Sequence, residues 1–147
     1  MKRIARFVPV PIVGGVGVSV LTYFRLLDHA KYPTDFFVQS ALPSEIVREI
    51  ESAGGRVVVL PPFSRPLSYL MRTVSELRNG HYDVVHSHMN TLSAFPLLAA
   101  LIVRVPIRIA QAHATSSWRE PLRHFSKLIL RPLTKLLATR YAACSEN

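Results

Sequence analysis

Short runs of apolar residues alternate with longer amphipathic segments along the whole chain. The short runs are rich in β-branched side chains and predict six strands, over Ile4–Val10, Asp35–Ser40, Arg56–Leu60, Asp83–Ser87, Ile107–Gln111 and Tyr141–Cys144. The longer segments have apolar residues at helical spacing and predict helices over Val16–Ala30, Ser44–Ala53, Pro66–Asn79, Thr91–Val103 and Arg119–Ala138. Gly54, Gly55 and Gly80 mark helix ends, and Pro132 is expected to interrupt or kink the last helix.

This regular strand–helix alternation determines the expected fold class. The strands are continuous apolar runs, as expected for strands that are buried on both faces of a parallel sheet. The sequence therefore predicts an α/β fold in one domain over residues 1–147, with a doubly wound, mostly parallel, Rossmann-like sheet. In such a sheet the binding site lies at the carboxyl ends of the strands, near the reversal of strand order. Four loops are expected there, namely Pro11–Gly17, His88–Thr91, His113–Trp118 and Ser145–Asn147.

The charge of the chain narrows the choice of partner. Lys and Arg number 18 against 9 Asp and Glu, so the formal net charge is +9. Such an excess indicates an acidic partner, either a phosphorylated substrate, a nucleic acid or an anionic membrane, unless it serves solubility alone. The chain has neither the recognised motifs of nucleic-acid binding nor an aromatic-rich basic strand, so we expect no nucleic-acid partner.

Three features bear on the compartment. Cys144 is the single cysteine, which excludes a disulfide within the chain and suits a reducing environment. The basic, apolar start is interrupted by prolines and glycines and lacks a signal-cleavage pattern. The apolar segment Leu92–Val103 is too short to span a bilayer. We therefore expect a cytoplasmic chain that is soluble or peripheral on the inner face of the cytoplasmic membrane.

A glycine-rich turn follows the first predicted strand. Gly14, Gly15 and Gly17 would let backbone N–H groups approach an anion at a helix N-terminus, although a tight turn alone would also explain them. The dinucleotide fingerprint is incomplete, because Val20 stands at its third glycine position and Gln39 ends the second strand where an acidic residue is needed. We therefore expect no nicotinamide cofactor.

Histidines and hydroxyls lie at the ends of the fourth and fifth predicted strands. His86 and His88 are two residues apart and share one face, and His113 follows the next strand. Three imidazoles could hold a metal, but no carboxylate or cysteine joins them in these loops, so we favour structural and cleft-lining roles without a metal. Thr115 and Ser116 beside His113 suit binding of a sugar or phosphate, and this loop can also cap the following helix.

The last predicted helix carries a basic stripe. Its five cations recur at intervals of four residues: Arg119, Arg123, Lys127, Arg131 and Lys135. Its other face is apolar: Leu122, Phe125, Ile129, Leu133 and Leu136. A stripe of this kind is usually the solvated face of a packed helix, but five cations without an interleaved acid favour an anionic membrane surface.

Several short motifs then occur in a fixed order. They are Gly14-Gly15, Lys31-Tyr32, the segment Glu51–Arg56, the segment Tyr82–Met89, the segment Val105–Ala110, Ala112-His113 and the segment Ala138–Glu146. This ordered set resembles the N-terminal domain of family-4 glycosyltransferases of the GT-B fold, especially the bacterial enzymes of capsular and exopolysaccharide synthesis. The resemblance covers the whole chain. One departure is Val16-Gly17, where the family often has Ala or Val and then Glu.

The resemblance implies a function. Family members transfer a sugar from a nucleotide sugar with retention of configuration, in a cleft between two domains and without an obligatory metal. Carried over to this sequence, Gly14 and Gly15 approach the donor phosphate and His113 lines the donor sugar, with His88, Thr115, Ser116 and Glu146 at the cleft. The acceptor would be a glycan or an acceptor linked to polyprenyl phosphate.

The resemblance also implies that the family's second domain, which binds the nucleotide sugar, lies outside this sequence. We therefore expect an acceptor-side domain that is inactive alone. The alternative is a stand-alone binding or regulatory module that pairs with a separately encoded donor domain.

Overall fold

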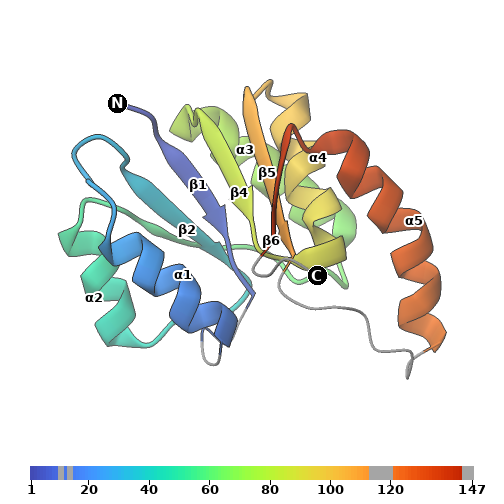
Figure 1. Ribbon diagram of the computed structural model, residues 1–147, viewed down its shortest axis with the longest axis horizontal. Helices are drawn as coiled ribbons and strands as arrows, with labels where there is room; N and C mark the ends of the chain where they lie inside the picture. Colours follow the sequence, from blue (N-terminus) through green and yellow to red (C-terminus); the bar gives the residue numbers. More distant parts are fainter. Residues whose placement is uncertain (10–11, 13–14, 113–120, 144–147) are drawn as a thin grey trace.

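A single parallel sheet forms the centre of the molecule in the computed structural model, which describes residues 1–9, 12, 15–112 and 121–143 (Figure 1). Within these residues the strands are β1 (Ile4–Phe7), β2 (Thr34–Val38), β3 (Val57–Val59), β4 (Val84–Ser87), β5 (Ile107–Ala112) and β6 (Arg140–Ala143). Their order in the sheet is β3-β2-β1-β4-β5-β6, and each neighbouring pair is parallel. The order reverses between β1 and β4, so the predicted doubly wound, Rossmann-like sheet is confirmed.

The helices cover the sheet from both sides. They are α1 (Gly15–Arg25), α2 (Ser44–Ser52), α3 (Pro66–Gly80), α4 (Ala94–Ile102) and α5 (Pro121–Leu137), with a short 3-10 helix, η1 (Asn90–Ser93), before α4. Side chains of α1 and α2 pack on one face of the sheet and those of α3, α4 and α5 on the other (Figure 1). The helix expected over Thr91–Val103 thus begins as a 3-10 turn, and α5 continues through Pro132 instead of being interrupted.

The first helix ends five residues earlier than its apolar spacing predicts. It stops at Arg25, whereas the pattern extended to Ala30. The reason is a local turn, in which the N–H groups of Lys31 and Tyr32 donate to the carbonyl of Asp28 at 3.0 and 2.8 Å. The chain therefore turns back early and delivers Thr34 to the start of β2.

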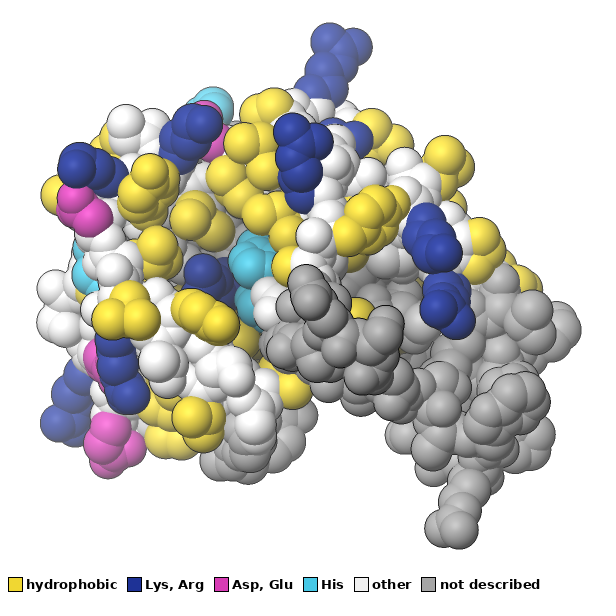
Figure 2. All heavy atoms as spheres, in the orientation of Figure 1, with side chains coloured by type: hydrophobic (Ala, Val, Ile, Leu, Met, Phe, Trp, Pro, Cys, Tyr) yellow, Lys and Arg dark blue, Asp and Glu magenta, His cyan; other side chains and the backbone are white. Residues whose placement is uncertain are grey.

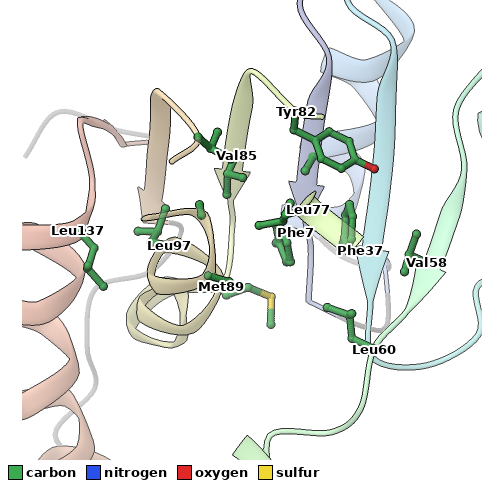
Figure 3. Close-up of a cluster of buried hydrophobic side chains, with 14 of the residues drawn as sticks. Phe7, Phe37, Val58, Leu60, Leu77, Tyr82, Val85, Met89, Leu97 and Leu137 are labelled. Atoms are coloured by element: carbon green, nitrogen blue, oxygen red, sulfur yellow. The ribbon is translucent and has the colours of Figure 1, made fainter. Parts of the chain in front are cut away.

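Alternation along the strands divides the buried side chains between two cores. Phe7 on β1 and Phe37 on β2 point toward α3 and α4, and their rings stack at 4.6 Å (Figure 3). The neighbouring Phe36 and Val38 point the other way, toward α1 and α2. Both faces of the central strands are thus buried, which is why these strands read as unbroken apolar runs.

One buried carboxylate joins four segments at the amino ends of the strands. Asp35 on β2 is 1% exposed. It accepts hydrogen bonds from Arg3 Nη2 at 2.8 Å, from the Arg56 backbone N–H at 2.8 Å and from the Tyr82 hydroxyl at 2.5 Å. Burial, reinforced by Asp35, raises the pKa of the Tyr82 hydroxyl, which therefore stays protonated as a donor. The segments that enter β1, β3 and β4 are held together here, on the edge opposite the candidate site.

Candidate functional site

In a doubly wound sheet a crevice is expected at the carboxyl ends of the two strands that flank the reversal of order, here β1 and β4. From β1 the chain leads to α1, and from β4 it leads to η1 and α4, which lies on the other face of the sheet (Figure 1). The backbone N–H of His88 donates to the carbonyl of Phe7 at 2.9 Å, so the two strands stay joined up to this edge. In doubly wound sheets this position is the usual place for a ligand.

The glycines that open α1 serve different purposes. A Cβ atom on Gly17 would lie 2.5 Å from the carbonyl carbon of Ile12, so the close approach of the turn to the helix requires a glycine there. A Cβ atom on Gly15 would meet no described atom within 4 Å. Packing within the chain therefore explains Gly17, while no described neighbour requires a glycine at position 15. Gly14 lies outside the described residues.

Two imidazoles lie together beside this crevice. The rings of His86 and His88 are 4.2 Å apart at an interplanar angle of 33°, which confirms that they share one face of the sheet. His86 is half-buried, and its Nε2 atom lies 2.8 Å from Oε1 of Gln111 on β5. His88 is only 2% exposed, so its side chain is buried below the ring of His86 that it contacts. Its predicted contact with substrate stays a prediction.

A buried arginine, Arg6, lies on the same face of the sheet as these histidines, and the sequence analysis did not identify it. Arg6 on β1 is the register partner of His86 on β4 and of Phe36 on β2. It is 5% exposed, and burial lowers the pKa of its guanidinium to about 10, so it remains charged at neutral pH. The available signal was a single charge within an otherwise apolar strand.

Several predicted site residues lie outside the part of the chain that the structure describes. These are His113, Thr115, Ser116 and Glu146. The three-histidine metal site, which the sequence analysis did not favour, would include His113. Among the described residues, no group of three or more His, Cys, Asp or Glu side chains could hold a metal ion.

The basic stripe of α5 is partly visible. Arg131 and Lys135 are exposed, whereas Arg119 is not described, and Arg123 and Lys127 are described only as positions in the helix. Ile129 and Leu136, expected on the opposite face, are 58% and 81% exposed. The outer surface of α5 therefore combines cations with apolar side chains.

A buried threonine fixes the rotation of α5. The buried hydroxyl of Thr134 lies 3.2 Å from the carbonyl of Thr91 and 2.8 Å from that of Leu130 within α5, its two possible acceptors, and Leu137 is buried against the core. These contacts turn Arg131 and Lys135 away from the sheet, as the predicted stripe requires. In the described part of the chain, no helix is long and apolar enough to cross a membrane.

Sequence comparison connects this doubly wound domain to a known family. Residues 13–147 match the model of Glycosyltransferase Family 4. The chain is also 31% identical over 142 residues to EpsF of Bacillus subtilis (strain 168), a protein named as a provisional glycosyltransferase. The chain thus belongs to Glycosyltransferase Family 4. The match covers 91% of this chain but 36% of EpsF, so the chain spans about a third of the length of that relative.

Comparison with solved structures shows that the fold of this chain is shared with other proteins. MurG of Acinetobacter baumannii is similar over 100% of this chain and 42% of its own, with a TM-score of 0.70 at 11% identity. HepE of Anabaena, in complex with UDP, is similar over 96% of this chain and 37% of its own, with a TM-score of 0.62 at 14% identity. A UDP-N-acetylglucosamine 2-epimerase of Listeria monocytogenes also matches, with a TM-score of 0.56. These likenesses concern the fold alone, and the link to glycosyltransferases rests on the family match.

Proposed function

We propose that this chain is the acceptor-side domain of a retaining glycosyltransferase that moves a sugar from a nucleotide sugar to a glycan acceptor carried on polyprenyl phosphate. The match to Glycosyltransferase Family 4 over residues 13–147 carries this proposal. The likeness to HepE, solved with UDP and with UDP-glucose, supports a nucleotide sugar as donor. The relation to EpsF supports a role in exopolysaccharide or capsule synthesis.

In this proposal the crevice between β1 and β4 forms one wall of the catalytic cleft. Gly14 and Gly15 approach the donor diphosphate, whose charge is favoured at the N-terminus of α1. His113 contacts the donor sugar, and Thr115, Ser116 and Glu146 line the same wall. Catalysis is then mainly electrostatic stabilisation of the leaving diphosphate, without an obligatory metal. Most of the groups that stabilise this charge belong to a nucleotide-sugar-binding domain beyond this sequence.

Domain exchange with EpsF tests the proposal. We expect no release of UDP above background from residues 1–147 alone, because one wall of a cleft neither binds the donor fully nor excludes water. A chimera in which residues 1–147 replace the matching third of EpsF should transfer sugar to a lipid-linked acceptor, also in the presence of EDTA. UDP release from UDP-sugars and mass analysis of the product are the measurements.

Three outcomes would change this conclusion. Turnover by residues 1–147 alone would contradict the interpretation of this chain as an acceptor-side domain that is inactive by itself. A folded chimera that binds the UDP-sugar but transfers to none of the acceptors would contradict the acceptor-side role. Transfer after simple mixing of the chain with the rest of EpsF, without a covalent link, would favour a separate module that pairs with a donor domain.

We also propose that α5 rests on the anionic inner surface of the cytoplasmic membrane. Arg131 and Lys135 supply positive charge along one side of the exposed surface of α5, and the exposed Ile129 and Leu136 flank that surface on its other side. Each cation near an anionic surface contributes about 1 kcal/mol, so the contact would be reversible and sensitive to salt.

Vesicle binding tests this contact. Sedimentation with phosphatidylglycerol vesicles at low salt should retain the wild-type chain, and exchanging both cations for Glu (Arg131→Glu with Lys135→Glu) should weaken partitioning by about tenfold or more. The matched control reverses two exposed cations elsewhere, Lys2→Glu with Arg48→Glu, and should have a clearly smaller effect. Equal losses of binding in both variants would mean that the overall net charge of the chain, and not α5, causes membrane binding. Absence of binding by the wild type would refute the proposed contact.

A further inference from the structure

Arg6 is a buried cation without a carboxylate partner among the described residues. The ion pairs there belong to other cations: Arg3 and Arg56 with Asp35, Arg25 with Glu49, Lys31 with Asp28, and Arg72 with Glu76. Among the described residues, Arg6 makes one hydrogen bond, from Nη1 to the carbonyl of Val20 on α1 at 3.2 Å. Its Nε atom is buried and has no hydrogen-bond partner in this part of the chain. A charge buried in this way is costly unless something compensates it.

No described neighbour of Arg6 supplies a negative charge. On one side its guanidinium carbon lies 6.0 Å from the ring centre of Phe36, a cation–π contact that offsets only part of the cost. On the other side the register partner is His86, which is followed on the same face by His88. Asp35, the nearest carboxylate along β2, alternates to the opposite face and is already bound by Arg3 and Arg56. The described part of this row therefore contains cationic, imidazole and aromatic groups without an acid.

The face of the sheet that carries Arg6, His86 and His88 is open to the outside at the crevice. On this face of the sheet α1 and α2 cover β1 to β3, and the described helices α3, α4 and α5 all lie on the other face (Figure 1). Figure 2 shows Lys or Arg side chains and His side chains next to one another in a recess at the middle of the drawn face. A small anion at the carboxyl ends of β1 and β4 could reach this recess.

We propose that Arg6 and His86 form a subsite for a phosphate group of a substrate at the switch point of the sheet. The guanidinium is a planar donor that suits phosphate oxygens, and its unused Nε–H offers a further hydrogen bond. The subsite rests on the proposed glycosyltransferase function, in which the phosphate comes either from the diphosphate of the donor or from the lipid phosphate of the acceptor. A purely structural role for Arg6, as a tether to α1, is the competing explanation.

Direct binding measured on the 147-residue chain separates these roles. The probes are UDP for the donor phosphate, hexyl phosphate for the lipid phosphate, and inorganic phosphate, each titrated while the NMR signals of His86 and His88 are followed. At least one probe should bind saturably and shift these signals. Arg6→Met should weaken that binding tenfold or more, and the stronger of UDP and hexyl phosphate identifies the source of the phosphate.

Stability provides the second readout. Arg6→Met removes a buried charge and should leave the chain as stable as the wild type or more stable, whereas a structural tether predicts destabilisation. The matched control is Arg140→Met, because Arg140 lies in the same register row on β6 but is exposed; it should change binding less than twofold. If Arg6→Met does not fold, Arg6→Gln replaces it with the same expected loss of binding.

The binding measurements can either support the proposed phosphate subsite or overturn it. Absence of saturable binding of all three probes, or equal binding by wild type and the Arg6 variants, would overturn the subsite. Neither result would bear on the glycosyltransferase function, which the EpsF chimera tests separately. Conversely, phosphate binding that depends on Arg6 would stand even if the chimera failed to transfer sugar.

Discussion

Replacing Asp35 with alanine should destabilise the chain by about 3–5 kcal/mol, because the change leaves the Arg3 guanidinium, the Arg56 backbone N–H and the buried Tyr82 hydroxyl without their acceptor. Asp35 is 1% exposed and receives hydrogen bonds from Arg3, Arg56 and Tyr82. Since a domain of this size is stable by about 5–15 kcal/mol in total, the loss is a large fraction of the whole. Thermal and urea unfolding followed by circular dichroism measure it, and the Tm should fall by about 10 °C or more.

Asp28→Ala is the matched control for this substitution. Asp28 also pairs with a cation, Lys31 at 3.2 Å, but both side chains are largely exposed. Surface pairs of this kind contribute about 0–1 kcal/mol, so this variant should unfold close to the wild type. If Asp35→Ala were no more destabilised than Asp28→Ala, the junction of the four segments would not contribute to stability as described.

His113→Ala should lower turnover of the EpsF chimera by about 100-fold, because loss of one well-placed catalytic group typically costs about 10²–10⁴ in rate. The residue follows β5, which ends at Ala112 on the same edge of the sheet as the start of α1. We propose that it contacts the donor sugar, so kcat should fall more than the affinity for the donor. Steady-state kinetics with varied UDP-sugar measures both quantities.

Two other histidines are compared with His113. His86→Ala should have a smaller effect than His113→Ala, because we propose that His113 contacts the donor sugar, whereas His86 shares the proposed phosphate subsite with Arg6. His81→Ala should change turnover less than twofold, since His81 ends α3 at the opposite edge of the sheet. Equal losses for His86, His88 and His113 that added metal restores would instead favour the three-histidine metal site.

The order of secondary structure was predictable from local patterns, whereas the charged groups inside the sheet were not. Val57, Val58 and Val59 form an apolar run that identifies a strand without any partner. Arg6 and Asp35 interrupt such runs without changing their overall pattern. Whether an interrupting charge is buried, paired or left unpaired depends on strands distant in the sequence.

The same limit applies to the candidate site. Spacing placed His86 and His88 on one face, and the 4.2 Å ring contact confirms this. Spacing could not show that Gln111 would bond His86, because that contact requires β5 to lie beside β4. The reason for Gly17 was also hidden, since it is the backbone of Ile12 that excludes a side chain there.

The position of β1 in the sheet has a consequence for biosynthesis. Within this sequence β1 is translated before the other strands and becomes a central strand, and its partner β4 comes much later: Ile4 pairs with Val84, and the Arg3 N–H donates to Asp83, 80 positions along the chain. Until β4 has been translated, the half made of β1 to β3 exposes the β4-facing edge of β1, with its unpaired N–H and C=O groups. Nascent chains of this protein therefore pass through an aggregation-prone interval, which ends only when the second half closes onto the first.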